Sequence, residues 1–392
     1  MKKILITAST FPRWDGDTEP RFILDYAKSM QKYYDVSVLV PSCPNAKDNE
    51  IIEGVNVIRY HYFPIRKWET LCCPGAIVAR IKQKKVRVLL VPFLLFSLWH
   101  KLHKIHKDYD IIHAHWMIPQ GIVQSYTGKT PYILTGHGSD ITSLNVFPIK
   151  GMKIRAMKKA SHITVVSEKL KEYVMDFYPN NYTDVMPMGC DTSCFSPKNR
   201  VENYFNQGNR KAILFVGRLA EVKGVKYLIQ ATQNIDNARL YIVGKGEMED
   251  SLRELAKPMG DKVVFLGAKT HEELSKIVPS ADVLVTPSIT ASDGSKEGFG
   301  LVLIEAMASG VPVVASNSGG IPNTITSGVN GLLTEEKDYV GIANAIRRIL
   351  DDEELRHNLI ENGKETAKKY DYSQIALHYR NIIENLLDGD EK

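Results

Sequence analysis

The sequence contains few cysteines and no cysteine motif. Five cysteines occur among 392 residues, and no two of them form a CxxC pair. They are Cys43, Cys72, Cys73, Cys190 and Cys194. An odd number of cysteines without such a pair favours reduced thiols. We therefore expect a cytoplasmic protein.

Long hydrophobic runs are also missing. The opening MKKILITASTF has two lysines but too few apolar residues for the core of a signal peptide, so it predicts a first strand. The apolar stretch VLLVPFLLFSLW, residues 88–99, is twelve residues long, whereas a membrane-spanning helix needs about 20. No transmembrane helix is predicted.

Acidic residues are scarce in the first half of the chain. Residues 1–200 contain 28 Lys and Arg against 17 Asp and Glu, although the whole chain carries only +5. A basic half can meet an anionic partner. Because no nucleic-acid recognition motif is present, we expect no nucleic acid and favour a membrane surface or a phosphorylated substrate.

Residues 80–107 contain eight Lys or Arg and no acidic residue. One interpretation is an interfacial segment, in which the bases meet anionic lipid while Phe, Leu and Trp enter the membrane boundary. The alternative is a helix packed on a sheet with solvated basic ends. The sequence leaves both open, and the first would make the protein peripheral on the inner face of the cell membrane.

Apolar, β-rich runs alternate with helical stretches in both halves of the chain, which is typical of parallel sheets covered by helices. The predicted strands are residues 2–9, 35–41, 55–63, 109–116, 130–137, 160–167, 211–219, 238–246, 261–268, 281–288 and 311–318. The fold class is therefore α/β, with two doubly wound, Rossmann-like domains. Because ligands bind beyond the carboxyl ends of such strands, we expect the substrate in a cleft between the domains.

A polar stretch without periodicity separates the two halves. The predicted boundaries are 1–195 for the first domain, 196–211 for a linker and 212–369 for the second domain. The amphipathic C-terminal helix, 370–392, is expected to pack across both domains.

Two glutamates, Glu297 and Glu305, lie eight residues apart in DGSKEGFGLVLIEAMASGVPVV. A helical interval of this length spans about 12 Å, more than the 5 to 9.5 Å or so between the carboxyls of glycoside hydrolases. The spacing fits two ends of one elongated ligand. Backbone amides near Gly300 and Leu301 at a helix start would favour an anion between those ends. Hydroxyls at both ends and phosphates in the middle describe a nucleotide sugar.

Two cations follow the first strand of the second half. Arg218 and Lys223 could clamp a pyrophosphate, or form an exposed basic turn. Gly244 and Gly246 lack the third glycine of the dinucleotide fingerprint, which disfavours an NAD site. They form either a tight turn or a nucleotide-facing turn.

With these motifs, VGRLAEVKGVKYLI, VGKGE, KEGFGLVLIEAMASGVPVVAS and SGGIP, the chain resembles the retaining GT-B glycosyltransferases of the large E-x7-E family (GT4-like). This family includes bacterial enzymes that build polysaccharides and lipid-linked glycans. The resemblance implies that Glu297 contacts the donor sugar, Glu305 the ribose, and Arg218 and Lys223 the diphosphate. It further implies donor contacts for Gly16, Gly244, Leu266, Gly298, Phe299, Gly300 and Leu301. Asn323 replaces the acid of the family's GGxPE ending.

The first half resembles the family's acceptor side. In TGHGSDI, His137 is expected at the reacting centre and Asp140 supports it. His113 and His115 lie on one face of a strand and are either acceptor-cleft residues or core histidines. They lack a third zinc ligand, and no metal is expected. Arg13 either binds an acceptor phosphate or pairs with nearby acids.

The sequence thus predicts a retaining transferase that moves a hexosyl unit from a UDP- or GDP-sugar to a saccharide, possibly lipid-linked, in the synthesis of surface polysaccharide or glycolipid. No cofactor is expected. The alternatives are a non-catalytic nucleotide-sugar or glycan-binding paralogue and a GT-B sugar-nucleotide epimerase.

Overall fold

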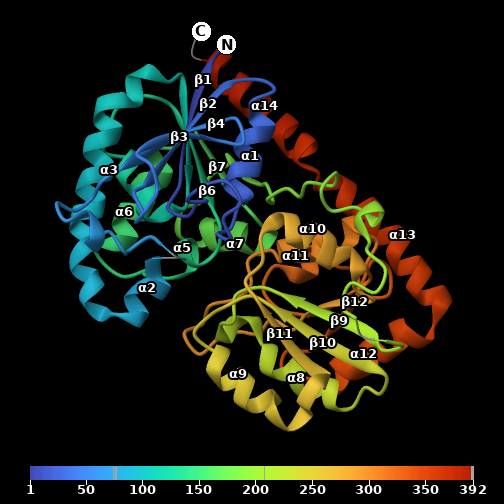
Figure 1. Ribbon diagram of the computed structural model, residues 1–392. Coiled ribbons are helices and arrows are strands. Elements are labelled where there is room, and N and C mark those ends of the chain that lie inside the picture. The colour runs from blue at the N-terminus through green and yellow to red at the C-terminus, as the bar shows by residue number, and fades with distance from the viewer. Residues whose placement is uncertain (74, 76, 207, 390–392) are drawn as a thin grey trace. The chain divides into compact units, whose positions relative to one another are not determined.

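The computed structural model describes residues 1–73, 75, 77–206 and 208–389, and the chain divides into two compact units. The first unit contains Met1–Met188 together with the C-terminal helix α14 (Tyr372–Gly389), and the second contains Gly189–Asp371. Each unit is built on its own sheet, so the predicted pair of α/β domains is confirmed (Figure 1).

The first unit contains an eight-stranded sheet in the order β3-β4-β2-β1-β5-β6-β7-β8. All pairs are parallel except the hairpin of β3 and β4. The strands are β1 (Lys3–Thr7), β2 (Asp35–Pro41), β3 (Asn49–Ile52), β4 (Val55–Tyr60), β5 (Ile111–His115), β6 (Tyr132–Gly136), β7 (His162–Val165) and β8 (Thr183–Val185). The buried runs of β1, β5 and β6 show why the sequence predicted strands covered on both faces.

Helices cover this sheet. They are α1 (Phe22–Met30), α2 (Ile77–Gln83), α3 (Val91–Ile105), α4 (Ile122–Gln124), α5 (Ser139–Thr142), α6 (Ile149–Lys159) and α7 (Glu168–Phe177). Among the described residues, the helical run Lys85–Asp108, which contains α3, is long and apolar enough to cross a membrane by length and composition alone. The run is longer than the twelve apolar residues seen in the sequence because flanking turns extend it.

Helix α14 completes the core of the first unit. Its Tyr379 ring is fully buried, lies 5.1 Å from the Tyr26 ring of α1, and its hydroxyl bonds the Thr164 hydroxyl at 3.1 Å. Figure 1 shows the red helix α14 beside the blue helix α1. The segment thus belongs to the first unit, and the expectation that it packs across both domains stays a prediction.

The second unit has a six-stranded parallel sheet in the order β11-β10-β9-β12-β13-β14. Its strands are β9 (Lys211–Val216), β10 (Ala238–Val243), β11 (Val263–Gly267), β12 (Val283–Thr286), β13 (Val313–Ser316) and β14 (Leu332–Thr334). Its helices are α8 (Val225–Gln233), α9 (Glu249–Ala256), α10 (His271–Ile277), α11 (Leu301–Ala308), α12 (Tyr339–Asp351) and α13 (Glu353–Lys369).

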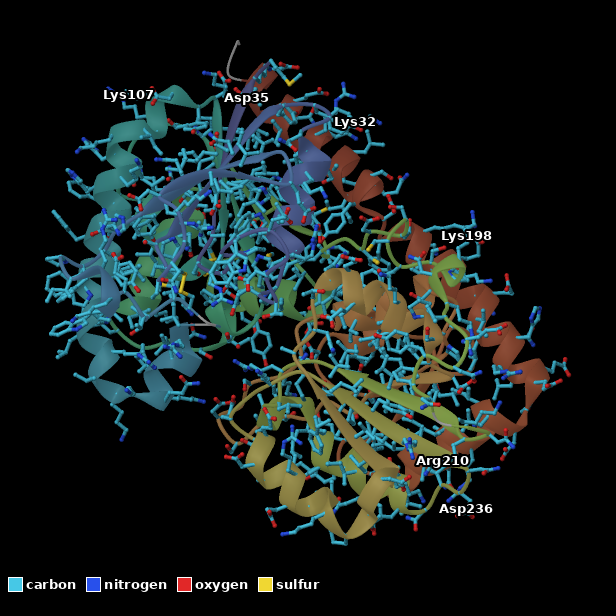
Figure 2. The ribbon with its side chains drawn as sticks, viewed as in Figure 1. Lys32, Asp35, Lys107, Lys198, Arg210 and Asp236 are labelled. Atoms are coloured by element: carbon cyan, nitrogen blue, oxygen red, sulfur yellow. A yellow bond between two sulfur atoms is a disulfide. The ribbon has the colours of Figure 1, made fainter. Side chains whose placement is uncertain are left out.

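The parallel register places the chemistry at one edge of this sheet. Lys211 of β9 pairs with Ala238 of β10, so the amino ends of these strands lie together, marked by Arg210 and Asp236 in Figure 2. The turns that contain Arg218 and Gly244 therefore share the opposite, carboxyl edge, where ligands of such sheets bind.

The two units separate after Met188, ahead of the polar stretch 196–211 that we expected to be a linker. This stretch belongs to the second unit because Arg200 donates to the carbonyls of Pro279 and Ala281 at 3.0 and 3.1 Å. Hydrogen bonds, and not an apolar face, hold residues 196–211 on the second unit. This explains why the stretch shows no hydrophobic periodicity.

Candidate active site

The candidate donor region of the second unit begins with the β12–α11 loop, residues 287–300. Glu297 lies in this loop, whereas Glu305 lies on α11, so the interval between them is only half helical. Gly300 caps the helix with a φ of +80°, a left-handed conformation that glycine adopts without strain. The first amides of α11 lack helical partners and lie at the positive end of its dipole, as the prediction of an anion site requires.

An ion pair occupies the centre of this region. The Lys223 ammonium contacts the Glu297 carboxylate, and the Ser288 hydroxyl donates to the same oxygen at 3.4 Å. Both charged side chains are mostly buried. Burial opposes ionisation of Glu297, but the Lys223 charge together with hydrogen bonds from Lys223, Ser288 and the Gly298 amide outweighs it and lowers the pKa of the carboxyl. Glu297 is therefore an anion at neutral pH.

Arg218 differs from Lys223 in having no carboxylate partner within the described residues. It follows β9 and is exposed. A guanidinium in this state offers several donors to a phosphate at little cost in broken contacts. Arg218 can therefore bind an anion without first breaking an ion pair.

Two carboxylates that were not predicted from the sequence hold the β12–α11 loop. Glu336 accepts hydrogen bonds from the Thr290 amide at 2.8 Å, the Thr290 hydroxyl at 2.9 Å and the Ser318 hydroxyl at 2.5 Å. Glu221 accepts from the amide and hydroxyl of Ser292 at 3.1 and 2.7 Å. Burial opposes ionisation of Glu336, but these hydrogen bonds lower its pKa. The loop that contains Glu297 is therefore fixed at two points.

Gly244 has a structural role at the carboxyl edge. A Cβ on Gly244 would lie 1.9 Å from the Gly217 carbonyl oxygen, and its amide donates to Gly267 at 2.9 Å. Only glycine fits here because two strand ends approach so closely. This is the tight turn that we weighed against a nucleotide-facing turn.

The other expected donor residues differ in exposure. Leu266, Gly298, Leu301 and Glu305 are partly exposed, whereas Gly300 is buried. Phe299 is 8% exposed, and its ring lies 5.4 Å from the ring of Tyr370. Phe299 therefore packs in the unit, and only its backbone is suited to contact a ligand.

Three histidines cluster in the first unit. His113 is buried on β5, and its ring nitrogens bond the Tyr26 hydroxyl at 2.9 Å and the Thr135 hydroxyl at 2.6 Å. His115 is also buried, with its Nδ1 bonded to His137 Nε2 at 3.0 Å. Within the described residues, no three His, Cys, Asp or Glu are placed to hold a metal. His113 is a core histidine, and His115 contacts the candidate catalytic ring.

His137 is partly exposed and follows β6. Its ring lies 4.8 Å from the Trp116 ring and 5.6 Å from the Phe22 ring. Although one edge of the residue reaches the surface, the rings around it exclude water from the imidazole and lower the pKa of His137 to about 4, and full burial lowers that of His113 to about 3. His137 is therefore neutral at pH 7 and can accept or donate a hydrogen bond.

Asp140 supports the histidine loop through its backbone. One carboxylate oxygen accepts from the amides of His137 and Gly138 at 3.0 and 2.8 Å, and the other from the Met117 amide at 2.7 Å. No bond joins this carboxylate to the His137 ring. Asp140 thus holds the backbone at His137 in place and does not select the tautomer of its ring.

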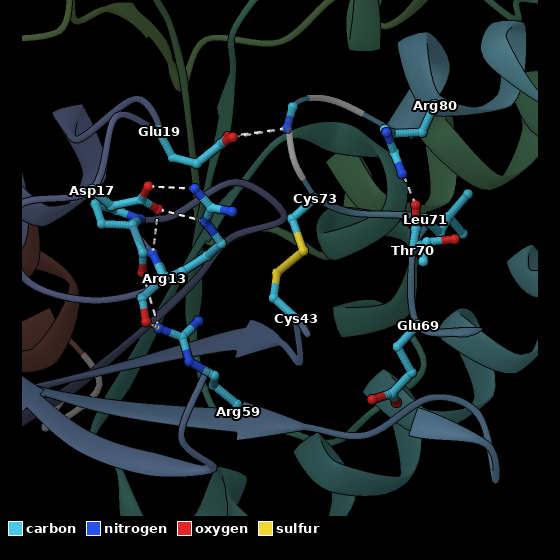
Figure 3. The surroundings of a disulfide bond; sticks show 12 residues. Arg13, Asp17, Glu19, Cys43, Arg59, Glu69, Thr70, Leu71, Cys73 and Arg80 are labelled. Carbon is cyan, nitrogen blue, oxygen red and sulfur yellow. Dashed lines mark hydrogen bonds and ion pairs between the residues drawn. A yellow bond between two sulfur atoms is a disulfide. The ribbon is translucent and has the colours of Figure 1, made fainter. Parts of the chain in front are cut away.

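The N-terminal loop pairs its own charges (Figure 3). Arg13 donates to Asp17 at 2.5 and 2.8 Å, which is the pairing alternative for this arginine. Gly16, which lies between Arg13 and Asp17 in the sequence, is in an exposed turn. The Glu19 carboxylate accepts a hydrogen bond from the Gly75 amide at about 3 Å. We infer no bound phosphate from Arg13.

A disulfide joins Cys43 to Cys73 beside this loop (Figure 3). The expectation that all five cysteines are reduced is therefore wrong for this pair. The pairing depends on a tertiary contact across 30 residues of sequence, which spacing alone does not reveal.

Comparisons with known proteins match both units. The family model for glycosyl transferases group 1 matches residues 198–366, and that for glycosyltransferase family 4 matches residues 20–193. An uncharacterized glycosyltransferase of Methanocaldococcus jannaschii is 34% identical over 74% of this chain and 79% of its own length. The phosphatidyl-myo-inositol mannosyltransferase of Mycolicibacterium smegmatis is 28% identical over 90% of this chain and 86% of its own length.

A solved structure is similar along nearly the whole chain. HepE from Anabaena, in complex with UDP, has a TM-score of 0.73 at 18% identity and covers 98% of this chain and 100% of its own. This likeness shows a shared fold.

Proposed function

Because the chain belongs to the glycosyl transferases group 1 family and is a GT-B glycosyltransferase, we propose that it transfers a hexosyl unit from a UDP- or GDP-sugar to a saccharide acceptor. The observation that carries this proposal is the fixed β12–α11 loop. It sets an ionised Glu297 beside a helix start and a cation pair on one sheet edge. The proposal needs no cofactor.

In the proposed reaction, the bond between the anomeric carbon and the diphosphate breaks. Arg218, Lys223 and the first amides of α11 stabilise the departing negative charge, the kind of electrostatic contribution that usually dominates catalysis. The acceptor hydroxyl attacks from the face that the diphosphate leaves, which retains the anomeric configuration. Its proton passes to the leaving diphosphate.

Glu297 and His137 receive different roles in this proposal. The Glu297 carboxylate orients the sugar hydroxyls and stabilises positive charge on the ring. His137, neutral because burial lowers its pKa to about 4, supplies a hydrogen bond to the sugar, a role that rests on the family resemblance. Glu305 is assigned to the ribose on the same basis.

The acceptor is proposed to be a saccharide linked to lipid. This class is supported by the name of the mannosyltransferase relative, whose acceptor is a phosphatidyl-inositol lipid. The product would enter surface polysaccharide or glycolipid, and the reaction would occur in the cytoplasm at the inner face of the membrane.

The test is a screen of UDP- and GDP-sugars with lipid-linked saccharides, followed by release of free nucleoside diphosphate. We expect release only when both substrates are present. Binding without release would support the non-catalytic paralogue, an altered sugar still attached to the nucleotide would support the epimerase, and release without acceptor would indicate hydrolysis of the donor. Normal transfer by Glu297→Ala would contradict the role of that residue. A product of inverted anomeric configuration would contradict retention.

A further inference from the structure

Exposed apolar side chains concentrate on one edge of the first unit. Of the 21 large hydrophobic residues that are exposed in the described chain, eight lie within residues 65–96. They belong to the 3-10 turn Arg66–Trp68 with its flanking Ile65, to α2, to the 3-10 turn Lys85–Leu90 and to α3. We call this the basic apolar surface. Contiguous exposed apolar area of this kind marks an interaction site.

Ring contacts join its elements into one surface. The Phe63 ring stacks on Trp68 at 5.7 Å and meets the edge of Phe93 at 5.1 Å, which ties the turn at 66–68 to α3. Arg87 bonds the Thr70 hydroxyl and the Arg80 carbonyl, which ties the second turn to α2. These residues, far apart in sequence, are therefore parts of one layer.

Most of the charge on this surface is positive, although Asp48 pairs with Arg66 of the turn 66–68 at 3.6 Å. Residues 70–107 contain no Asp or Glu. Lys67, Lys84 and Lys85 are all exposed, and Lys107 extends from the end of the α3 run (Figure 2). Exposed Trp68 lies on the same turn as Lys67, and exposed Phe93 and Phe96 lie between Lys85 and Lys107 on the helical run Lys85–Asp108. Bases beside exposed rings are the pattern of a membrane-interface helix.

The opposite face of helix α3 packs against the rest of the first unit. Leu94, Leu98 and Leu102 recur every four residues and are fully buried, packed against α4 and β4. Trp99 and His103 bond the carbonyls of Tyr126 and Thr127 at 3.2 Å. A helix held in this way along its length can lie on a membrane but does not cross one. Of the two interpretations of residues 80–107, the structure shows a helix packed on the protein, and contact with lipid stays a prediction.

We propose that the basic apolar surface docks the first unit on an anionic lipid bilayer. Phe93, Phe96 and Trp68 enter the boundary between headgroups and acyl chains, and Lys84 and Lys85 contact lipid phosphates. This inference goes beyond the transfer reaction and does not depend on it. A bilayer would cover the exposed rings and neutralise the bases at the same time.

A second copy of the chain fits this surface less well. In a symmetric dimer, the same patch meets itself, so the excess bases of both copies would come together, while the nearby Asp48 is already paired with Arg66. Single-stranded nucleic acid needs free aromatic faces for stacking, whereas the Trp68 ring already stacks on Phe63. Charge complementarity therefore favours the lipid surface.

The experiment measures co-sedimentation of the full chain with two kinds of vesicle, phosphatidylcholine alone and equal parts of phosphatidylcholine and phosphatidylglycerol. We expect binding to the second kind only. Lys84→Gln/Lys85→Gln should weaken that binding about thirtyfold, since each base near an anionic surface is worth about a fivefold factor. Phe96→Ser should weaken it about tenfold. Brominated lipid should quench tryptophan fluorescence, and Trp68→Phe should abolish most of this quenching.

Matched controls keep the test specific. Lys368→Gln/Lys369→Gln removes an adjacent exposed pair from α13, and Phe147→Ser removes an exposed ring outside the surface; neither should change vesicle binding. Equal loss in the controls, or no binding by the unaltered chain, would overturn the proposal. Loss of self-association by Phe96→Ser, with vesicle binding unchanged, would overturn it in favour of an interface between copies. All substituted side chains are exposed, and thermal unfolding verifies that each variant is folded.

Discussion

Lys223 and Glu297, which the family resemblance assigns to different parts of the donor, form an ion pair with each other in this structure. The pair joins the turn after β9 to the β12–α11 loop. Each partner keeps the other charged in a mostly buried place, because an unpaired ion there would lose its hydration without compensation. The charges proposed to meet the donor are therefore already in position.

Removing one partner of this pair should destabilise the fold, whereas removing both should not. We expect Lys223→Met to lower the free energy of unfolding by about 1 to 3 kcal/mol, because the Glu297 carboxylate loses its partner. Lys223→Met/Glu297→Gln should recover most of that loss, and both variants should be inactive. Urea unfolding and donor turnover measure the two effects. If the single and double variants have the same free energy of unfolding, the ion pair does not contribute to stability.

Arg218 should affect catalysis without affecting stability. It is exposed and has no carboxylate partner in the described chain, so Arg218→Met should change the free energy of unfolding by no more than about 0.5 kcal/mol. The rate should fall by about 10²- to 10³-fold, as expected when one donor to a developing anion is lost. Calorimetry should show that Arg218→Met binds nucleoside diphosphate more weakly than the unaltered chain does. Lys226→Met, which removes another exposed base nearby in sequence, should leave both rate and binding unchanged.

Glu336 should act as a positioning residue through the β12–α11 loop. Glu336→Gln leaves one acceptor oxygen for three donors from Thr290 and Ser318, so the loop should loosen. We expect kcat/KM for the donor to fall about ten- to hundredfold, since small misplacements of binding groups are costly. Hydrogen exchange should accelerate in residues 289–297 and not elsewhere. Its exposed neighbour provides the control, because Glu335→Gln should alter neither measurement; a uniform increase in exchange would contradict local positioning.

The long buried strands and the E-x7-E loop were predictable from sequence because hydrophobic runs and glycines mark them directly. Strands β3 and β8 were missed because only one residue of each is buried, and β14 because it has only three residues. Parallel pairing of β5 and β6 accounts for the His115–His137 contact, since His115 is in register with Thr135. This contact could have been anticipated once the order of the strands was known.

Other parts of the site depend on tertiary contacts that no local pattern records. Glu336 lies in the polar segment TEEKD, where nothing distinguishes it from Glu335 until the fold brings Thr290 and Ser318 to its carboxylate. The Cys43–Cys73 disulfide is similar, because Cys72 is equally close to Cys43 in sequence. Paired acids and thiols of this kind are recognised only from three-dimensional distances.

The buried histidines should make the first unit sensitive to acid. The pKa of His113 is lowered to about 3 by burial, and that of His137 to about 4, whereas an unfolded histidine titrates near 6.5. Below pH 6.5 the unfolded chain therefore binds more protons than the folded chain, and stability falls until the folded pKa values are reached. Between pH 7 and pH 5, each histidine should cost up to about 2 kcal/mol. Urea unfolding at both pH values measures this loss, which His113→Gln should reduce and His378→Gln, on the exposed side of α14, should leave unchanged. If His113→Gln loses as much stability between pH 7 and pH 5 as the unaltered chain, the buried ring is not the source of the acid sensitivity.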